Sequence, residues 1–119
     1  MLSHVGRHSA EVDGARRSVE FLQQNCHSDP VDLKVWLSPA VGKATYPIAK
    51  KGGKGLHEVI VEQLMQAGVL SENIEISRVD TATDPNYFSH SQFKAGRQAG
   101  IDGRFSVVAM MRGRGETAF

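Results

Sequence analysis

The sequence has very few cysteines and no long apolar run. Cys26 is the single cysteine among 119 residues, which excludes an intrachain disulfide framework and favours a reducing compartment. No apolar run approaches the ~18 residues that a membrane span needs, and the first residues lack the apolar segment of a signal peptide. We therefore expect a cytoplasmic protein with no membrane partner.

The net charge is also small. Lysine and arginine number 14 and aspartate and glutamate 13, which leaves a formal charge of +1. No strong field therefore draws the chain to nucleic acid or to an anionic membrane. The apolar share of 40% and the charged share of 23% are typical of a globular protein. We expect a single α/β domain at residues 1–111 and a disordered tail at residues 112–119.

The chain is organised around a predicted strand that ends in a loop. Leu33, Val35 and Leu37 recur with a period of two, which predicts a strand with one face turned into a core. Pro39 ends the ladder because it has no N–H to donate, and Gly42 lets other groups approach the backbone closely. Ligands of α/β proteins usually bind at such a strand end, so we expect a ligand site there.

Two helices are predicted from apolar residues spaced by three and four. The first begins with Ser9 as its N-cap, has Val12 in its apolar stripe and ends near residues 24–26. The second covers residues 56–67, with Gly68 in the C′ position.

Further strands are predicted on either side of an aromatic segment. Residues 73–79 alternate, and residues 105–111 form an apolar run typical of a strand buried on both faces. Between them we expect a turn at residues 80–84 and a loop or short helix at residues 85–96. Strands that alternate with helices predict an α/β layered fold.

Some segments have both a functional and a simpler interpretation. The basic, glycine-rich residues 49–55 precede a helix and could hold a phosphate, but a mobile solvated loop is the favoured interpretation. None of the five histidines forms an H-E-x-x-H pair. We expect His57 to be solvated on a helix surface, whereas aromatic neighbours make His90 a plausible part of a pocket wall. Cys26 is a weak candidate nucleophile.

Three segments resemble motifs of one family. Residues 37–46, L-S-P-A-V-G-K-A-T-Y, are similar to G-P-A-I-G-x-C-x-Y-E, and residues 56–77 to N-x-x-Q-L-x-x-A-G-V-x-x-x-N-I. Residues 84–91, D-P-N-Y-F-S-H-S, and 102–109, D-G-R-F-S-V-V-A, are similar to F-F-S-[YH]-R-R-D and T-G-R-M-A. In this order the motifs resemble the laccase-domain family, also described as polyphenol oxidase or peptidoglycan-editing-factor-like proteins.

The resemblance spans nearly the whole chain but only the C-terminal half of a usual family member. His4 falls on the first residue of the family's H-A-G-W-R-G motif and corresponds to one of its three metal ligands. The other two ligands, a histidine and a cysteine, belong to the missing half, so a zinc site is expected to be incomplete in one chain. Ala44 and Thr45 stand where the family's loop has its cysteine, and Ser91 and Gln92 replace its paired arginines.

The family fold implied is a layered α/β sandwich with a mixed sheet, related to a cysteine-hydrolase toxin domain. Family activities implied by the resemblance are zinc-dependent purine nucleoside cleavage, adenosine deamination, amide editing of cell-wall precursors and phenol oxidation. Our first hypothesis is a reduced laccase-domain protein, either a purine nucleoside phosphorylase- or hydrolase-like enzyme or a binder of a similar small molecule. The alternative is a non-catalytic module that kept the fold and lost the metal. The residues expected at the ligand, beside His4, are Gly42, Tyr87, Phe88, Ser89, His90 and Arg104.

We also expect this chain to associate with a second chain. In full-length relatives the missing half supplies strands beside this part of the sheet. Its absence would leave unpaired strand edges and uncovered apolar surface, which proteins normally cover. We therefore expect a homodimer, or a complex with a separate chain equivalent to the missing half.

Overall fold

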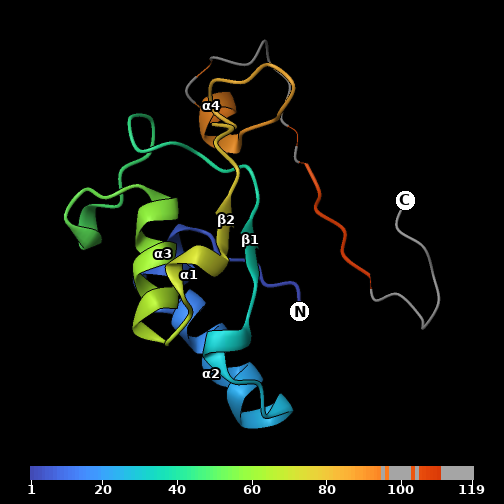
Figure 1. The fold of residues 1–119 in the computed structure, drawn as a ribbon. Coiled ribbons are helices and arrows are strands. Elements are labelled where there is room, and N and C mark those ends of the chain that lie inside the picture. The colour runs from blue at the N-terminus through green and yellow to red at the C-terminus, as the bar shows by residue number, and fades with distance from the viewer. Residues whose placement is uncertain (95, 97–102, 104, 111–119) are drawn as a thin grey trace.

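The computed structural model describes residues 1–94, 96, 103 and 105–110. Short 3-10 turns at Pro30–Asp32, Ala49–Lys51 and Ser71–Asn73 connect the longer elements. Within these residues the helices and strands shown in Figure 1 are α1 (Arg7–Glu11), α2 (Gly14–Cys26), β1 (Val35–Leu37), α3 (Leu56–Gln66), β2 (Ile74–Ile76) and α4 (His90–Lys94).

β1 and β2 form a parallel pair in which Trp36 lies opposite Glu75. Because α3 connects the two strands, they form a β–α–β unit. The pairing resumes beyond the strands, where Ala40 forms a bridge with Asp80. The expected α/β class is confirmed. In the described part of the chain the sheet consists of these two strands, and an isolated antiparallel bridge lies apart from it in the loop at residues 48–54.

The helices α1, α2 and α3 lie on one side of the two strands, and α4 lies beyond the strand ends (Figure 1). Leu33, Val35 and Leu37 pack against the hydrophobic core. Trp36, which alternates with them, is 52% exposed. The period of two predicted for this strand is therefore confirmed, with its apolar face against the helices.

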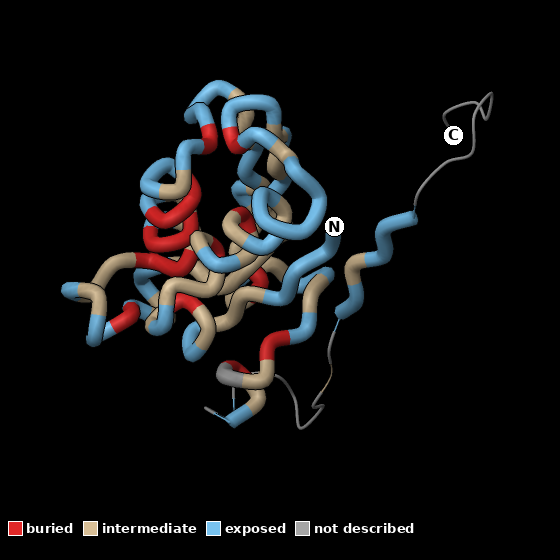
Figure 2. The backbone as a smooth tube through the Cα atoms, turned by 90° about the horizontal axis from the view of Figure 1, so that it is seen from below, coloured by how far each residue is buried: buried red, intermediate tan, exposed pale blue. Residues whose placement is uncertain are grey.

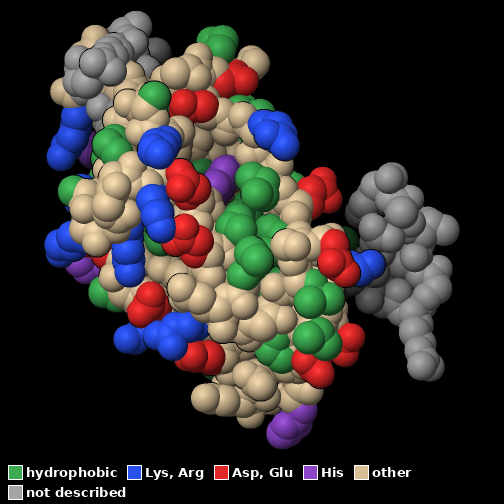
Figure 3. Space-filling view, turned by 60° about the vertical axis from the view of Figure 1, so that its left-hand side comes forward, with side chains coloured by type: hydrophobic (Ala, Val, Ile, Leu, Met, Phe, Trp, Pro, Cys, Tyr) green, Lys and Arg blue, Asp and Glu red, His purple; other side chains and the backbone are tan. Residues whose placement is uncertain are grey.

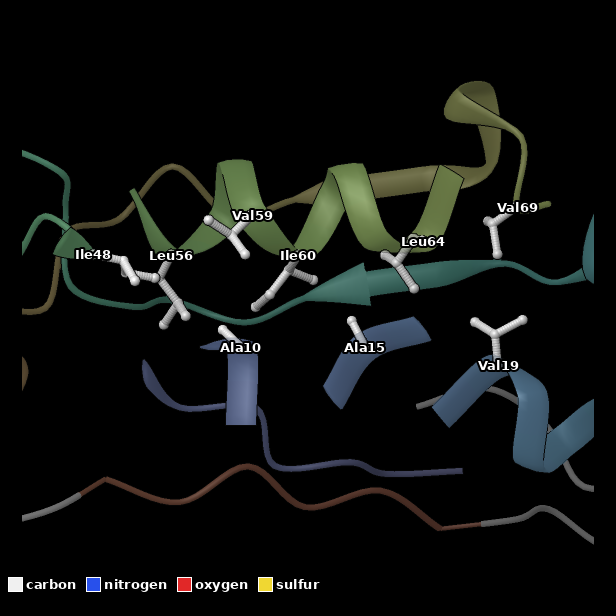
Figure 4. Packing of buried hydrophobic residues seen from close by; sticks show 9 residues of the cluster. All are labelled: Ala10, Ala15, Val19, Ile48, Leu56, Val59, Ile60, Leu64 and Val69. Atoms are coloured by element: carbon white, nitrogen blue, oxygen red, sulfur yellow. The ribbon is translucent and has the colours of Figure 1, made fainter. Parts of the chain in front are cut away.

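The core lies between α3 and the two N-terminal helices. Figure 4 shows side chains of α3 pointing toward those of α1 and α2, and Figure 2 shows buried positions gathered along these helices. Ile48 and Val59 are the largest fully buried side chains, and burial of each contributes about 1.5–3 kcal/mol. The buried apolar residues are Ala10, Ala15, Val19, Ile48, Leu56, Val59, Ile60, Leu64 and Val69.

The prediction of one continuous helix from Ser9 is wrong. Asp13 takes a left-handed conformation with φ 62°, which separates α1 from α2. A Cβ atom on Gly14 would overlap the side chain and backbone of Ser9, so a glycine allows the sharp change of direction. Ser9 lies inside α1 rather than at an N-cap. As a result Ala10 is buried and Val12 is 50% exposed.

The second predicted helix is confirmed as α3, which ends two residues before Gly68. Gly68 has φ 101°, a conformation that favours glycine. Its N–H donates to the Met65 carbonyl oxygen at 3.0 Å, and the Val69 N–H donates to the Leu64 carbonyl oxygen at the same distance. No helix in the described residues is long and apolar enough to cross a membrane.

The buried strand predicted at residues 105–111 is wrong for the part that the structure describes. Residues 105–110 have no strand assignment, and Val108 and Met110 are 86% and 68% exposed. Figure 2 shows this segment beside the body of the protein rather than within it. A strand buried on both faces needs a layer on each side, and among the described residues the helices α1, α2 and α3 cover one side of the sheet. Position 111 and the predicted tail at residues 112–119 lie outside the described residues.

Candidate functional site

A cavity of about 970 Å³ lies at the carboxyl end of β1. Its volume is at the upper end of the ~300–1,000 Å³ typical of small-molecule sites. Parallel strands end at the same edge of a sheet, and the segments that follow them there commonly hold the ligands of α/β proteins. The structure thus has a cavity where the sequence predicts a ligand site.

The cavity wall combines aromatic rings with polar side chains. It is formed by the N-terminal segment at residues 2–7, the end of β1, the first turns of α3, and the segments at residues 88–90 and 105–107. The aromatic residues in the wall are Trp36, Tyr46, Phe88 and Phe105, and the polar ones include His4, Ser38, His57, Thr81, Ser89 and His90.

The structure brings four of the sequence-predicted residues together in this wall, namely His4, Phe88, Ser89 and His90. Ser89 is only 6% exposed. The His90 ring stacks on that of Phe93 one helical turn later, with the ring centroids 6.3 Å apart. α4 therefore holds the His90 side chain in place beside the cavity.

Tyr87 supports the wall instead of lining it. Its ring meets that of Phe105 edge-on, with the centroids 5.2 Å apart and the planes at 85°. Gly103 lies against the Phe88 ring so closely that a Cβ atom would overlap the ring. The motif segments at residues 84–91 and 102–109 are thus in contact, and Gly103 lies against Phe88 at the cavity. Arg104, the next predicted site residue, lies outside the described residues.

Gly42 lines a second, smaller cavity of about 310 Å³. A Cβ atom on Gly42 would overlap the Asp80 carboxylate, so the expected close approach to this glycine occurs. Asp80 is held by its own turn, because its Oδ1 accepts a hydrogen bond from the Ala82 N–H at 2.8 Å. Its carbonyl oxygen accepts another from the Asp84 N–H at 2.9 Å. The turn predicted at residues 80–84 is therefore confirmed.

His57 is not simply solvated, contrary to the sequence-based expectation. It is half-buried, and its Nε2 lies 2.9 Å from the carbonyl oxygen of Ser38. The bond joins the first turn of α3 to the residue that follows β1. Sequence spacing gives no sign of a bond between positions so far apart, so this wall residue was missed.

Tyr46 was also missed as a wall residue, although it belongs to a motif singled out in the sequence. The Arg7 guanidinium carbon lies 5.4 Å from the centre of its ring, a cation–π contact. Tyr46 and Arg7 both line the large cavity. The contact joins the N-terminal helix to the loop after β1, and so fixes one side of the cavity.

The basic loop at residues 49–55 is less suited to phosphate than its sequence indicates. Lys54 hydrogen-bonds to Glu62, and this bond, with the nearby carboxylates, raises the Lys54 pKa above its usual value. Each lysine of the loop faces an acidic side chain, so its charge is partly neutralised. Figure 3 shows basic and acidic side chains side by side over much of the surface in view. The ion pairs are Lys50–Glu11 at 3.5 Å, Lys51–Asp13 at 3.8 Å and Lys54–Glu62 at 2.7 Å.

The described residues of this chain do not fit a zinc site. His4 lies in the cavity wall, but no three histidine, cysteine, aspartate or glutamate residues within the described segments are grouped to hold a metal. A zinc site in a protein needs three or four protein ligands.

The β–α–β unit with a cavity at its carboxyl edge defines a protein of the α/β class. The family described as multi-copper polyphenol oxidoreductase laccase matches residues 49–111, more than half of the chain. The chain belongs to this family, as the resemblance of its motifs implied.

Two solved structures share the fold. YlmD from Geobacillus stearothermophilus is 23% identical with a TM-score of 0.72, and the hypothetical protein YfiH from Bacillus licheniformis is 22% identical with a TM-score of 0.69. Each match covers 85% of this chain and 45% of the other, so this chain spans less than half the length of these relatives. At such identities the likeness concerns the fold. No curated protein matches the sequence.

Proposed function

We propose that this chain is a reduced laccase-domain protein that binds a purine nucleoside or a similar small molecule in the large cavity. The observation that carries the proposal is the cavity wall, in which four aromatic residues accompany histidines and hydroxyl groups. Stacking on an aromatic ring suits a planar base, and hydroxyl and imidazole groups suit its polar edge and a sugar. The purine preference itself comes from the family resemblance.

Phe88 is the residue on which the proposal is best tested. It lines the cavity and is 43% exposed, so its truncation leaves the buried core intact. Base–aromatic stacking contributes about 1–3 kcal/mol, so Phe88→Ala is expected to weaken adenosine binding about 5- to 150-fold in isothermal titration calorimetry. Phe21→Ala is the matched control, because Phe21 is 53% exposed on α2 and does not line this cavity. An equal loss of adenosine affinity in both variants, or no loss in either variant, would contradict the proposal.

A non-catalytic module is the second candidate function. It is favoured by the lack of three grouped metal ligands within the described segments. An assay of adenosine and inosine with phosphate, at several zinc loadings, separates an enzyme from a small-molecule binder and from an interaction module. Release of base or ammonia would support an enzyme. Binding without turnover would support a small-molecule binder, and neither binding nor turnover would leave an interaction module.

Association is part of the proposal because large apolar side chains are exposed on the N-terminal segment, on β1 and on residues 105–110. Leu2 is 58% exposed and Trp36 is 52% exposed, and Val108 and Met110 are exposed still more. Side chains of this kind normally mark an interface where they form a continuous patch. We propose a homodimer, or a complex with a separate chain equivalent to the rest of the longer relatives.

A cytoplasmic location completes the proposal. Cys26 is a free and exposed thiol, as expected of a protein kept in a reducing compartment. Fractionation of cells that express the tagged chain tests this, and recovery from an oxidising compartment would contradict it.

A further inference from the structure

His57 is placed between the two cavities. The large cavity and the small cavity share Ala40, Val41 and His57 in their walls. Of these three, only His57 has a polar side chain. A ligand in either cavity therefore meets the imidazole ring as the polar part of the shared wall.

The hydrogen bond to Ser38 fixes the tautomer of the ring. A backbone carbonyl oxygen only accepts hydrogen bonds, so Nε2 of His57, 2.9 Å away, must carry the proton and donate it. In the neutral ring the other nitrogen, Nδ1, then has a lone pair and acts as an acceptor. The ring thus offers its neighbours an acceptor of known position.

The ring is also held in place by its surroundings. Its helix, α3, is anchored in the core by Leu56, Val59 and Ile60, all buried. Its bonded partner, Ser38, directly follows β1. A binding group held by rigid elements loses little freedom when a ligand arrives.

We infer that His57 is a binding residue of this site, whose Nδ1 accepts a hydrogen bond from an N–H or O–H group of the ligand. The inference rests on the proposed function. It narrows the ligand to a small molecule with a donor facing this wall, such as an amino or hydroxyl group, and disfavours an anion that has only acceptors. Arg78 and Asp80 line the small cavity beside the ring, so the polar groups there include both signs of charge.

The tautomer is tested without any ligand, by long-range ¹H–¹⁵N NMR of the histidine rings in the full chain. His57 is expected in the Nε2–H form, whereas the exposed His8 and His27 are expected to average between both forms. A His57 ring that averages, or that carries its proton on Nδ1, would overturn the inference.

The role in binding is tested with adenosine as the probe. His57→Gln keeps an N–H donor for the Ser38 carbonyl but removes the Nδ1 acceptor, so its melting temperature is expected to stay close to wild type while binding weakens about 3- to 10-fold. His8→Gln is the matched control, because His8 is exposed on α1 and lines neither cavity. His57→Phe removes both bonds and is expected to bind no better than His57→Gln.

The outcomes separate this inference from the proposed function. Binding by His57→Gln equal to that of wild type would overturn the inference and leave the proposed function standing. Failure of the wild-type chain to bind adenosine or inosine would overturn both. Weaker binding by His57→Gln alone, together with the Nε2–H tautomer, is the expected result.

Discussion

The side-chain Oε1 of Gln63 accepts a hydrogen bond from the backbone N–H of Ala15 at 3.2 Å. The Nε2 of the same side chain donates to the carbonyl oxygen of Ala10 at 2.7 Å. Gln63 is 3% exposed on α3. One buried amide thus replaces the backbone bonds that a continuous helix would have made across the break between α1 and α2.

Replacement of Gln63 by leucine is expected to destabilise the protein. Two buried backbone groups lose their partners, and each such loss costs about 1–3 kcal/mol, so we expect a fall of about 2–6 kcal/mol in the free energy of unfolding. Urea denaturation followed by circular dichroism measures this. Gln66→Leu, at an exposed position of the same helix, is the control and should change stability by less than about 0.5 kcal/mol. Similar values for both variants would contradict the role of Gln63.

Gly42→Ala is expected to destabilise the loop after β1, because the new Cβ overlaps the Asp80 carboxylate. Overpacking of this kind typically costs about 1–3 kcal/mol. In a double-mutant cycle with Asp80→Ala the two costs should not add, since the second change removes the atoms that clash. Thermal and urea unfolding of the four proteins measures the coupling. Strictly additive costs would show that the loop moves aside without strain.

The ion pair of Lys54 and Glu62 predicts a small effect at high pH. Because the hydrogen bond to Glu62 raises the Lys54 pKa above 10.5 in the folded protein, the pair stabilises the fold fully below pH 10.5. Its contribution is lost as the pH rises through the raised pKa. The stability difference between wild type and Glu62→Gln should therefore shrink above pH 10.5. NMR titration should give Lys54 a higher pKa in the wild type than in Glu62→Gln, and equal values would contradict the pairing.

Tight zinc binding by a single chain is not expected. His4 supplies one bond, and a zinc site needs three or four protein ligands. After dialysis, a dilute monomer should retain well under one zinc ion per chain by atomic emission. The control is His4→Ala, which should retain the same small amount. Stoichiometric zinc in a monomer, lost in His4→Ala, would show that a site is completed by residues outside the described part of the chain.

Light scattering at micromolar concentration is expected to show a dimer. The exposed segment at residues 105–110 and the free face of Trp36 provide the apolar surface for it. Val108→Lys combined with Met110→Lys should shift the protein toward monomer, because it places two charges in that surface. Phe21→Lys, on α2, is the control and should leave the mass unchanged. A stable, monodisperse wild-type monomer would contradict the prediction.

Much of the fold could be predicted where local pattern decides it. The alternation of Leu33, Val35 and Leu37 and the spacing in α3 are set by which side chains face the core, and this shows in the sequence. The break after α1 could not be predicted, since it depends on a left-handed Asp13 and on contact between Gly14 and Ser9. Local propensity disfavours a left-handed conformation at Asp13, and it gives no information on a contact between Gly14 and Ser9.

The candidate site was predictable only in part for a similar reason. Its motif residues His4, Phe88, Ser89 and His90 lie in one wall, whereas His57 joins the wall through a bond to a carbonyl far away in sequence. For the apolar run at residues 105–110 the sequence predicted burial that the structure does not have. Its composition is that of a buried strand, but burial depends on which surfaces the rest of the protein provides.

The parallel pairing of Val35 with Ile74 has a consequence during synthesis. The chain emerges from its N-terminus, so β1 leaves the ribosome before α3, and α3 before β2. At about 5–20 residues per second, β1 waits for several seconds before β2, its partner in the described part of the chain, emerges. During that interval α1 and α2 are already complete and can cover its inner face, while its edges stay open to other nascent chains. We expect chaperone contacts to be strongest in this window and to fall once β2 has emerged.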